Sequence, residues 1–458
     1  MEKTIIDVLK TQRKFQLSAD SKNINNRISA LKRLKSSIKI HEEELLVALW
    51  KDLRKSRFES YTTEIGIVYS EIDLHIKNIK KWASPKKVST PQIIHFYSVS
   101  KIYKKPYGQV LIIAPWNYPF QLLINPLIGA ISAGNCAVLK PSEYTPNVAT
   151  VLQKIIESAF NKELVAIFLG GIELNTLLLE QKWDLIFFTG SPKVGKIVMK
   201  AAAENTTPVI LELGGKSPCI IDKDANLKTA ASRVVWGKLL NAGQTCIAPD
   251  YFMVHKDVKQ KFMSLLADKT ETFYGLNAKE SEDYGRISTK ENVERLSKYL
   301  IESEIYYGGE YDIDQKYFQP TILNNVSYNQ PVMKSEIFGP IFPIIEFDDI
   351  NEVIGYINKN PRPLALYYFG QDKKQQQFVL TNTNSGGACI NEVVMHIANH
   401  NLPFGGVGNS GIGNYHGKAS FEAFSHSRSV LFKSTFIDIK LRYPSYSKFK
   451  DRLARLFM

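Results

Sequence analysis

The sequence predicts an α/β protein built on a doubly wound parallel sheet. Between residues 110 and 215, short apolar runs alternate with longer windows that have helical spacing. The runs are hydrophobic throughout, as expected of strands that are covered on both faces. Turn residues mark the ends of the windows, and repeated strand–helix–strand units fold into a parallel sheet between two layers of helices. The predicted strands are 110–114, 137–139, 165–169, 185–188 and 209–211.

The flanking segments extend this prediction. Residues 24–53 repeat apolar side chains at three- and four-residue steps, which predicts helices. A second α/β region runs from about 216 to 420, with a strand at 252–255 and a helix at 258–272. Two β-prone segments, 90–103 and 427–433, have an exposed pattern. They form either an arm that pairs with another subunit or an ordinary surface hairpin.

The composition is that of a large globular protein. Of 458 residues, 44% are hydrophobic and 22% are charged, which excludes disorder as the main state. Four cysteines are too few for a disulfide framework and favour a reducing compartment. The net charge of +13 suits anionic ligands, nucleic acid or an acidic membrane surface. No nucleic-acid motif and no zinc-binding spacing accompanies it, so we expect neither nucleic acid nor a metal.

We also expect a cytoplasmic protein. The first residues contain no apolar stretch long enough for a signal peptide. The uncharged run 106–139 is interrupted by Pro115, Pro119 and Pro126, which disfavours a membrane span and favours a buried α/β interior.

Cys246 is the candidate nucleophile. It follows an apolar helical window and is preceded by Gly243, Gln244 and Thr245, small and polar residues that suit an accessible thiol. A thiolate is nucleophilic enough for covalent catalysis once its proton is removed. Local sequence alone leaves a structural role equally open, and a buried, inert role is expected for the other three cysteines.

Glu212 and Asn117 are candidates for the remaining catalytic roles. Glu212 ends an apolar strand beside Gly214 and Gly215, where a carboxylate is costly unless it has a partner or a task such as general base. The amide of Asn117, just after the first strand, could stabilise an oxyanion. A solvated strand end and an Asx turn are the simpler alternatives for these two residues.

Several motifs at the same sheet edge suit a dinucleotide. The turn Thr189-Gly190-Ser191 leads into a helix whose free N–H groups favour phosphate, and Gly195 allows close packing. Lys140 and Glu143 follow the second strand, where a carboxylate binds a ribose diol or forms a surface salt bridge. Glu336 and Phe338 precede a turn and act either as a ribose clamp or as a loop anchor. None of these signals is specific alone.

Together and in this order, the motifs resemble those of the aldehyde dehydrogenase superfamily over nearly the whole chain. The matching segments are Ala114-Pro-Trp-Asn-Tyr-Pro119, Lys140-Pro-Ser-Glu143, Phe188-Thr-Gly-Ser191 with Gly195, Glu212-Leu-Gly-Gly-Lys-Ser-Pro218, Gly243-Gln-Thr-Cys246, Glu336-Ile-Phe-Gly-Pro340 and Pro403-Phe-Gly-Gly406. The chain looks most similar to the class-three branch, which oxidises aliphatic, often long-chain, or aromatic aldehydes. The short N-terminal region, Cys246-Ile-Ala-Pro-Asp-Tyr251 and Phe424-Ser-His-Ser-Arg428 followed by Arg442-Tyr443-Pro444 indicate that branch.

The resemblance implies two doubly wound α/β domains and a small β bridging arm, assembled as a homodimer. The expected ranges are 1–88 and 106–211 for the dinucleotide-binding domain, 212–420 for the catalytic domain, 89–105 and 421–435 for the arm, and 436–458 for a basic tail.

The resemblance also assigns roles. Cys246 would attack the aldehyde, the Asn117 amide and the Cys246 N–H would hold the oxyanion, and hydride transfer to nicotinamide would leave a thioester. Glu212 would activate the water that hydrolyses the thioester. The residues that would hold NAD or NADP are Lys140, Glu143, Thr189, Gly190, Ser191, Gly195, Glu336 and Phe338. Glu143 favours NAD because its charge repels a 2′-phosphate, although Lys140 offsets part of that repulsion.

The tail and the competing functions complete the expectations. Phe449, Leu453, Leu456 and Phe457 fall at helical spacing among basic residues. This pattern suggests a helix that touches acidic membrane, packing on a dimer partner or a simply solvated tail. The enzymatic rival is a relative that is reductive or passes the thioester to another acceptor such as coenzyme A. The presence of Glu212 favours water. A catalytically silent binding protein is the rival from another class.

Overall fold

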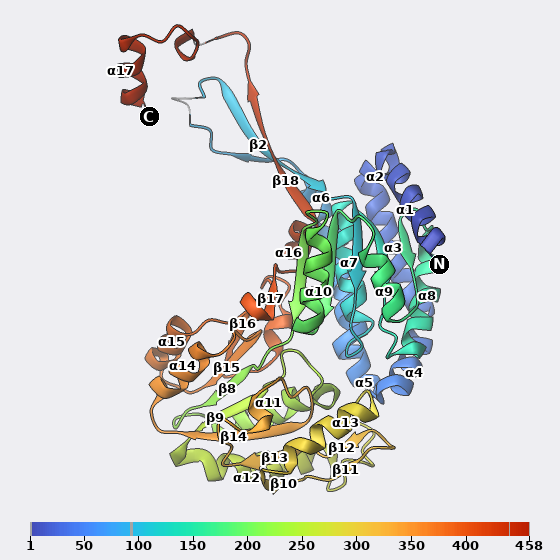
Figure 1. Cartoon of the computed structure of the whole chain (residues 1–458), viewed down its shortest axis with the longest axis vertical. Coiled ribbons are helices and arrows are strands. Elements are labelled where there is room, and N and C mark those ends of the chain that lie inside the picture. The colour runs from blue at the N-terminus through green and yellow to red at the C-terminus, as the bar shows by residue number, and fades with distance from the viewer. Residues whose placement is uncertain (1, 92–94, 439, 458) are drawn as a thin grey trace.

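Two mainly parallel β-sheets, one above the other in Figure 1, form the body of the protein. This computed structural model describes residues 2–91, 95–438 and 440–457. The first sheet has six strands in the order β17-β7-β6-β3-β4-β5. Its strands are β3 (Gln109–Ile113), β4 (Cys136–Lys140), β5 (Val165–Ile167), β6 (Leu185–Gly190), β7 (Val209–Leu213) and β17 (Gly411–Ile412). The five strands predicted from the sequence are confirmed, with ends that shift by one or two residues.

Helices cover both faces of this sheet because successive side chains of each buried strand point to opposite sides. Leu111 and Ile113 of β3 pack in the apolar cluster with one set of helices, while Val110 and Ile112 pack in the cluster with the other set. The first set is α1 (Glu2–Leu17), α9 (Ile172–Leu179) and α10 (Pro192–Ala203). The second set is α3 (Ile24–Ile40), α4 (Glu42–Leu53), α6 (Gly66–Ala83), α7 (Gln121–Ala133) and α8 (Pro146–Ala159).

One strand of the first sheet comes from far along the chain. β17 is antiparallel to β7 and places Gly411 opposite Glu212. The sheet is therefore parallel except at this edge, which the sequence did not predict.

The second sheet has seven strands in the order β10-β13-β14-β9-β8-β15-β16. All its neighbours are parallel except β10 and β13. Its strands are β8 (Pro218–Ile221), β9 (Tyr251–His255), β10 (Glu304–Tyr307), β13 (Thr321–Asn324), β14 (Ile341–Phe347), β15 (Ala365–Phe369) and β16 (Gly387–Ile390). Its helices are α11 (Leu227–Leu239), α12 (Lys259–Tyr274), α13 (Lys290–Ser297), α14 (Ile350–Lys359) and α15 (Lys373–Asn382). The predicted strand at 252–255 and helix at 258–272 correspond to β9 and α12.

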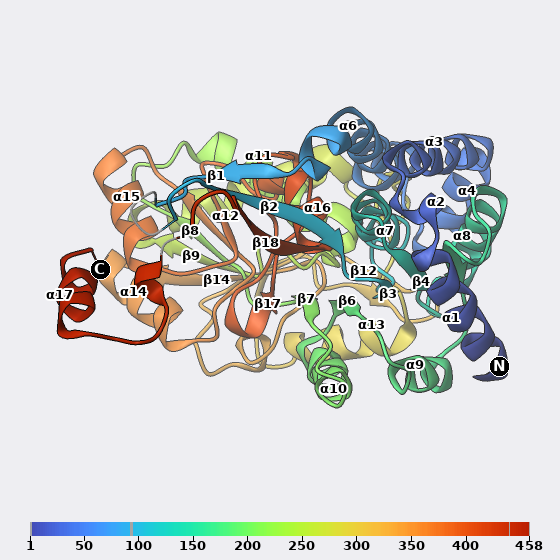
Figure 2. The same ribbon diagram turned by 90° about the horizontal axis from the view of Figure 1, so that it is seen from above.

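A three-stranded sheet projects from the body as an arm (Figure 1). It consists of β1 (Lys86–Val88), β2 (Ser98–Pro106) and β18 (Ser425–Lys433), with β2 paired to β18 along nine residues. Of the β-prone segments, 427–433 lies in β18 and residues 98–103 lie in β2, whereas residues 90–91 and 95–97 form no strand. Residues 92–94 lie outside the described residues. Seen from above in Figure 2, the arm crosses the body, and helix α17 (Lys448–Phe457) lies at the opposite end from the N-terminus. Within the described ranges, no helix is long and apolar enough to cross a membrane.

Candidate active site

The three catalytic candidates come together where the two sheets meet. Asn117 follows β3, Glu212 lies in β7, and Cys246 follows α11 and a short 3-10 turn (Leu240–Gly243). The side-chain amide of Asn117 donates to the carbonyl oxygen of Gln244 at 3.0 Å, two residues before Cys246. The carboxylate of Glu212 is close enough to Cys246 for its charge to raise the pKa of the thiol. The structure therefore brings together residues from three separate parts of the chain.

An unusual backbone conformation presents Cys246. Asn241, Ala242 and Gly243 have successive φ values of 51°, 52° and 79°, a left-handed run that is costly for residues other than glycine. Gly243 is required there for a second reason, since a Cβ atom would clash with the carbonyl oxygen of Gly339.

Hydrogen bonds hold this strained loop in place. The Asn241 N–H donates to Glu59 Oε1 at 2.7 Å. Gln244 Nε2 donates to the carbonyl oxygens of Asn241 and Arg286, both at 2.9 Å, and Gln244 Oε1 accepts from the Ser288 N–H at 2.8 Å. The buried Gln244 side chain thus fixes the loop before the sulfur to the rest of the fold.

The Cys246 thiol is partly buried and protonated at neutral pH. Burial raises its pKa to about 12, the charges of Glu336 and Glu212 add to the shift, and the backbone N–H groups of Cys246 and Ile247 oppose it. A thiol of this kind needs a base to become a nucleophile. Cys136 and Cys219 are buried, and the Cys389 sulfur lies 3.2 Å from His396 Nδ1.

Glu212 is a buried carboxyl without a partner. Its side chain is 3% exposed, and neither carboxylate oxygen has a hydrogen-bond partner in the part of the chain that the structure describes. Burial raises the pKa of Glu212 well above its usual value. Such an arrangement is expensive for stability and is typical of acid–base groups.

Asn117 is held by hydrogen bonds to its backbone carbonyl oxygen and from its side-chain amide. Its backbone oxygen accepts from Lys55 Nζ at 3.2 Å and from Asn241 Nδ2 at 2.8 Å. Together with the bond to Gln244, these contacts fix the amide beside the loop that carries the sulfur. Preorganised donors of this type stabilise an oxyanion without having to reorient.

The dinucleotide candidates lie at the carboxyl ends of β4 and β6. Lys140 ends β4, is 1% exposed, and forms an ion pair of 2.5 Å with the partly exposed Glu143. Thr189 has a buried hydroxyl without a partner among the described residues, and Ser191 caps α10 by accepting from the Val194 N–H at 3.3 Å. Pro192 has no N–H, and the Val194 and Gly195 N–H groups already donate to Ser191. The Lys193 N–H is therefore the group at the start of α10 that is left for a phosphate, beside the unpaired Thr189 hydroxyl.

Two glycines allow the chain to pack closely at this edge. A Cβ atom on Gly190 would lie 2.5 Å from the Phe188 ring, and one on Gly195 would lie 2.7 Å from Leu213 Cδ2. The orphaned Thr189 hydroxyl and this cradle fit a nicotinamide dinucleotide.

Glu336 and Phe338 close the site from the second sheet. A side chain on Gly214 would clash with the Glu336 carboxylate, so Glu336 lies directly over the end of β7. Burial raises the pKa of Glu336 to about 8, and the charge of Asp250 adds to the shift, whereas the Gly215 N–H, Lys216 and Lys238 oppose it. Phe338 packs edge-on against Trp116 with 5.4 Å between ring centroids.

The sequence did not reveal the buried ion pair that supports Asn117. Lys55 and Glu64 are both fully buried, with 2.6 Å between Lys55 Nζ and Glu64 Oε1. Glu64 Oε2 also accepts from the Phe120 and Gln121 N–H groups at the start of α7, at 2.9 and 3.2 Å. A lone lysine and glutamate carry no sequence signal that separates such a pair from surface charges.

Comparisons with a family model, with related sequences and with solved structures all indicate the same protein family. The model of the aldehyde dehydrogenase family matches residues 2–430. The chain is 47% identical over 439 residues to the 4,4'-diaponeurosporen-aldehyde dehydrogenase of Staphylococcus aureus, with 95% of both chains covered. It is 42% identical over 443 residues to the dimeric NADP-preferring aldehyde dehydrogenase of Canis lupus familiaris, covering 96% of this chain and 97% of the relative. The substrate-bound structure of Staphylococcus aureus AldH matches with a TM-score of 0.96 and 44% identity, covering 99% of both chains.

Proposed function

The chain belongs to the aldehyde dehydrogenase family, and it is an NAD(P)-dependent enzyme that oxidises aldehydes to carboxylic acids. From this premise we propose that Cys246 is the nucleophile, Glu212 the general base and Asn117 the oxyanion-binding residue. The observation that carries the assignment is the convergence of these three residues between the two sheets, where the buried Glu212 carboxyl has no partner among the described residues.

The first step is attack of the Cys246 sulfur on the aldehyde carbon. Because burial holds the thiol in its protonated form, the proton must leave as the bond forms. Glu212 lies close enough to influence that thiol and, once ionised, is a stronger base than an ordinary carboxylate since burial raises its pKa.

The resulting thiohemiacetal carries a negative oxygen. The Asn117 amide and the Cys246 N–H donate to it, and the contacts from Lys55 and Asn241 keep the amide in place. Removing one preorganised donor of this kind costs about 10²–10³ in kcat.

A dinucleotide would be held at the carboxyl ends of β4, β6 and β7. The start of α10 with Ser191 would receive phosphate, and Gly190 and Gly195 belong to the same turn. The unpaired Thr189 hydroxyl would donate to the ligand. Glu143 with Lys140 and Glu336 with Phe338 would hold the riboses. When bound, the nicotinamide ring supplies the acceptor for the hydride. The Glu143 carboxylate favours NAD over NADP, because a 2′-phosphate would lie next to its charge.

The second half of the reaction hydrolyses the thioester on Cys246. Glu212 removes a proton from the attacking water, and this activity separates a dehydrogenase from an acyl-transferring relative. Release of acid without an added thiol is the expected result.

The proposed substrates are apolar aldehydes, aliphatic or aromatic. One relative is named as a 4,4'-diaponeurosporen-aldehyde dehydrogenase, and this name supports an aldehyde substrate with a long apolar chain. The proposed assembly is a homodimer that forms through the arm; the name of the canine relative calls that protein dimeric. The proposed ranges are 1–88 and 106–211 for dinucleotide binding, 212–420 for catalysis, 89–105 and 421–435 for the arm, and 436–458 for the tail.

The decisive test replaces Cys246 with alanine. We expect Cys246→Ala to lower the rate of NAD(P)H formation by about 10⁴-fold, because no thiohemiacetal can form. Cys389→Ala is the matched control and should retain turnover, since that sulfur contacts His396 and not Glu212. Substantial turnover by Cys246→Ala would refute the assignment.

A further inference from the structure

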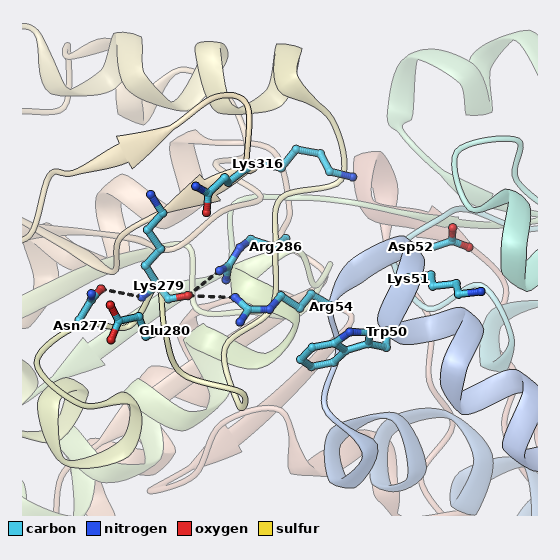
Figure 3. A pocket seen from close by; sticks show the side chains of 10 residues that line it. Trp50, Lys51, Asp52, Arg54, Asn277, Lys279, Glu280, Arg286 and Lys316 are labelled. Atoms are coloured by element: carbon cyan, nitrogen blue, oxygen red, sulfur yellow. Dashed lines mark hydrogen bonds between the residues drawn. The ribbon is translucent and has the colours of Figure 1, made fainter.

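A cavity of about 910 Å³ lies apart from the residues assigned above (Figure 3). One wall is the C-terminal end of α4 with Trp50 and Arg54, and the other comes from residues 277–286 and 315–316. None of the catalytic or dinucleotide candidates lines it. The catalytic mechanism therefore makes no use of this cavity.

Two guanidinium groups meet inside the cavity. Arg54 Nη1 and Arg286 Nη2 donate to the same oxygen, the backbone carbonyl of Lys279, at 3.0 and 2.6 Å (Figure 3). Arg286 Nη1 also donates to the carbonyl oxygens of Tyr284 and Gly285, at 3.2 and 3.1 Å. Carbonyl oxygens carry only partial charges, so they do not neutralise the two cations. Arg286 is 7% exposed, which makes the mutual repulsion of the two groups stronger than it would be in water.

No carboxylate compensates these charges. In the described ranges, neither arginine forms an ion pair, and Lys316 reaches only the Ser288 carbonyl oxygen, at 3.3 Å. Lys279, also in the lining, has its own partner, Asp312, at 2.8 Å.

Two acidic residues line the cavity without neutralising it. Asp52 is engaged elsewhere, because its carboxylate accepts from Asn147 Nδ2 at 2.6 Å and from the Val148 N–H at 2.9 Å at the start of α8. Glu280 is exposed and forms no ion pair within the described part of the chain. The cavity thus retains an excess of positive charge.

We propose that this cavity binds a multivalent oxyanion, with a diphosphate as the group that fits it. Planar guanidinium groups match phosphate oxygens in pairs, and the Lys316 ammonium adds a point charge. The Trp50 ring, stacked 5.4 Å from the Arg54 guanidinium, adds an apolar wall for the organic part of a larger ligand. Free diphosphate and the diphosphate of an organic molecule present the same groups to the site.

The walls of the cavity continue into the catalytic loops. The Arg286 carbonyl oxygen accepts from Gln244 Nε2 at 2.9 Å, and the Arg286 N–H donates to the Leu53 carbonyl oxygen at 2.9 Å. Next to Arg54, Lys55 donates to the Asn117 carbonyl oxygen at 3.2 Å. An anion that joins Arg54 and Arg286 therefore ties together the segments that hold Asn117 and Gln244.

The test measures binding by calorimetry to the full chain saturated with NAD, so that the dinucleotide site is already filled. Inorganic pyrophosphate is titrated at constant ionic strength, and binding to one site is expected.

The variant that combines Arg54→Gln with Lys316→Gln should bind pyrophosphate about tenfold or more weakly, because charge-assisted hydrogen bonds are lost. A second titration with ADP identifies the source: tighter binding than pyrophosphate indicates an organic diphosphate, and equal or weaker binding indicates the free ion.

The control is Lys32→Gln with Lys39→Gln, which removes the same charge from the exposed surface of α3. It should leave pyrophosphate affinity unchanged. If the double cavity variant does not fold, Lys316→Gln against Lys32→Gln gives the same comparison, since Lys316 loses only one long hydrogen bond. Absence of binding in the NAD-saturated protein, or equal weakening in the cavity and control variants, overturns the proposal. Neither result bears on the role of Cys246.

Discussion

The ionised Glu212 carboxylate disfavours ionisation of the Cys246 thiol. The Cys246 thiol has a pKa raised by burial to about 12, and the charges of Glu336 and Glu212 contribute to that shift. Burial alone holds the Glu212 pKa well above its usual value. The proton of the Cys246 thiol can pass to the ionised Glu212 carboxylate as the substrate is attacked.

This coupling predicts the pH dependence of thioester hydrolysis. Glu212 acts in its deprotonated form, so the hydrolysis rate of the wild-type enzyme should rise with pH through the elevated pKa of that carboxyl. In Glu212→Gln the rate should be lower by about 10²-fold and should lose this rise. Single-turnover measurements of acid release across pH, with intact mass detection of the acyl-enzyme, test the expectation.

Glu143→Gln serves as the control for that experiment, because Glu143 contacts Lys140 and lies away from the sulfur. It should keep the pH profile of hydrolysis. A Glu212→Gln variant with the wild-type profile and no accumulated acyl-enzyme would assign the base to another residue.

At the level of single residues, sequence reasoning identified groups with a distinctive neighbourhood and missed those without one. Cys246 stands among small polar residues, and Glu212 ends an apolar strand, so both could be singled out. Gln244, Lys55 and Glu64 could not, because a buried hydrogen-bond network is assembled by residues distant in sequence. Their roles follow only from the three-dimensional contacts.

At the level of elements, helix α6 is tied to the segment that leads to β17. Glu71 of α6 lies 3.1 Å from His75 Nε2 and 2.8 Å from His400 Nδ1, and it accepts from the Gly417 N–H at 2.7 Å. Burial alone would raise the pKa of Glu71, but the hydrogen bonds with His400 and His75 lower it below the usual value. The network thus fixes the strand that pairs with Glu212.

This network predicts a specific response to acid. Since the pKa of Glu71 is lower in the folded than in the unfolded state, its stabilising contribution is present above about pH 4.3 and disappears as the pH falls further. Glu71→Gln should lower the free energy of unfolding by about 3 kcal/mol near pH 7 and reduce its decline below pH 4. Urea unfolding curves at a series of pH values measure both effects.

His400 should contribute to stability with the opposite pH dependence, which the same unfolding curves measure. Its pKa is raised by the hydrogen bond with Glu71, so its contribution is present at low pH and is lost as the pH rises through the raised value. Identical pH dependence in wild type and Glu71→Gln would contradict the proposed role of the network.

The elements themselves were predictable where hydrophobic patterning is strong. The five parallel strands of the first sheet are almost fully buried, so their apolar runs stand out from the sequence. Helix α1 was not predicted, because it buries only Ile5, Val8 and Gln12 and therefore has a weak pattern. Strand β17 has two residues and its pairing is antiparallel, which leaves no periodic signal to detect.

At the level of the whole molecule, the arm presents an open sheet edge. β18 is an edge strand of nine residues, with Leu431 and Phe432 about half exposed. Long exposed edges of this kind pair with another chain unless they are protected. A second copy of this chain is the partner that the proposed homodimer places there.

Leu431→Glu should therefore weaken self-association. The added charge would enter the proposed interface, and we expect a dissociation constant raised by about tenfold or more. Light scattering coupled to size exclusion measures the mass as a function of concentration. Leu17→Glu, the same change at an exposed leucine of α1, is the matched control and should leave the mass unchanged. Equal behaviour of both variants would place the dimer contact elsewhere.

The C-terminal helix α17 gives the last prediction. Lys448, Lys450, Arg452 and Arg455 surround Phe449 and Leu456, which are 69% and 75% exposed. A basic amphipathic helix of this type binds acidic lipid surfaces. Deletion of residues 446–458 should reduce cosedimentation with phosphatidylserine-containing vesicles and should not change sedimentation with neutral phosphatidylcholine vesicles. Unchanged sedimentation with acidic vesicles would exclude the tail as a membrane contact.

The contact between Gly243 and Gly339 has a consequence for chemical intervention. The loop that carries the sulfur and the loop that carries Glu336 and Phe338 touch backbone to backbone, with no side chain between them to absorb a displacement. Any compound that wedges the 336–340 loop outward would also shift the residues leading to Cys246. Such a compound would disarm the nucleophile from a distance, without competing for the space that the aldehyde occupies.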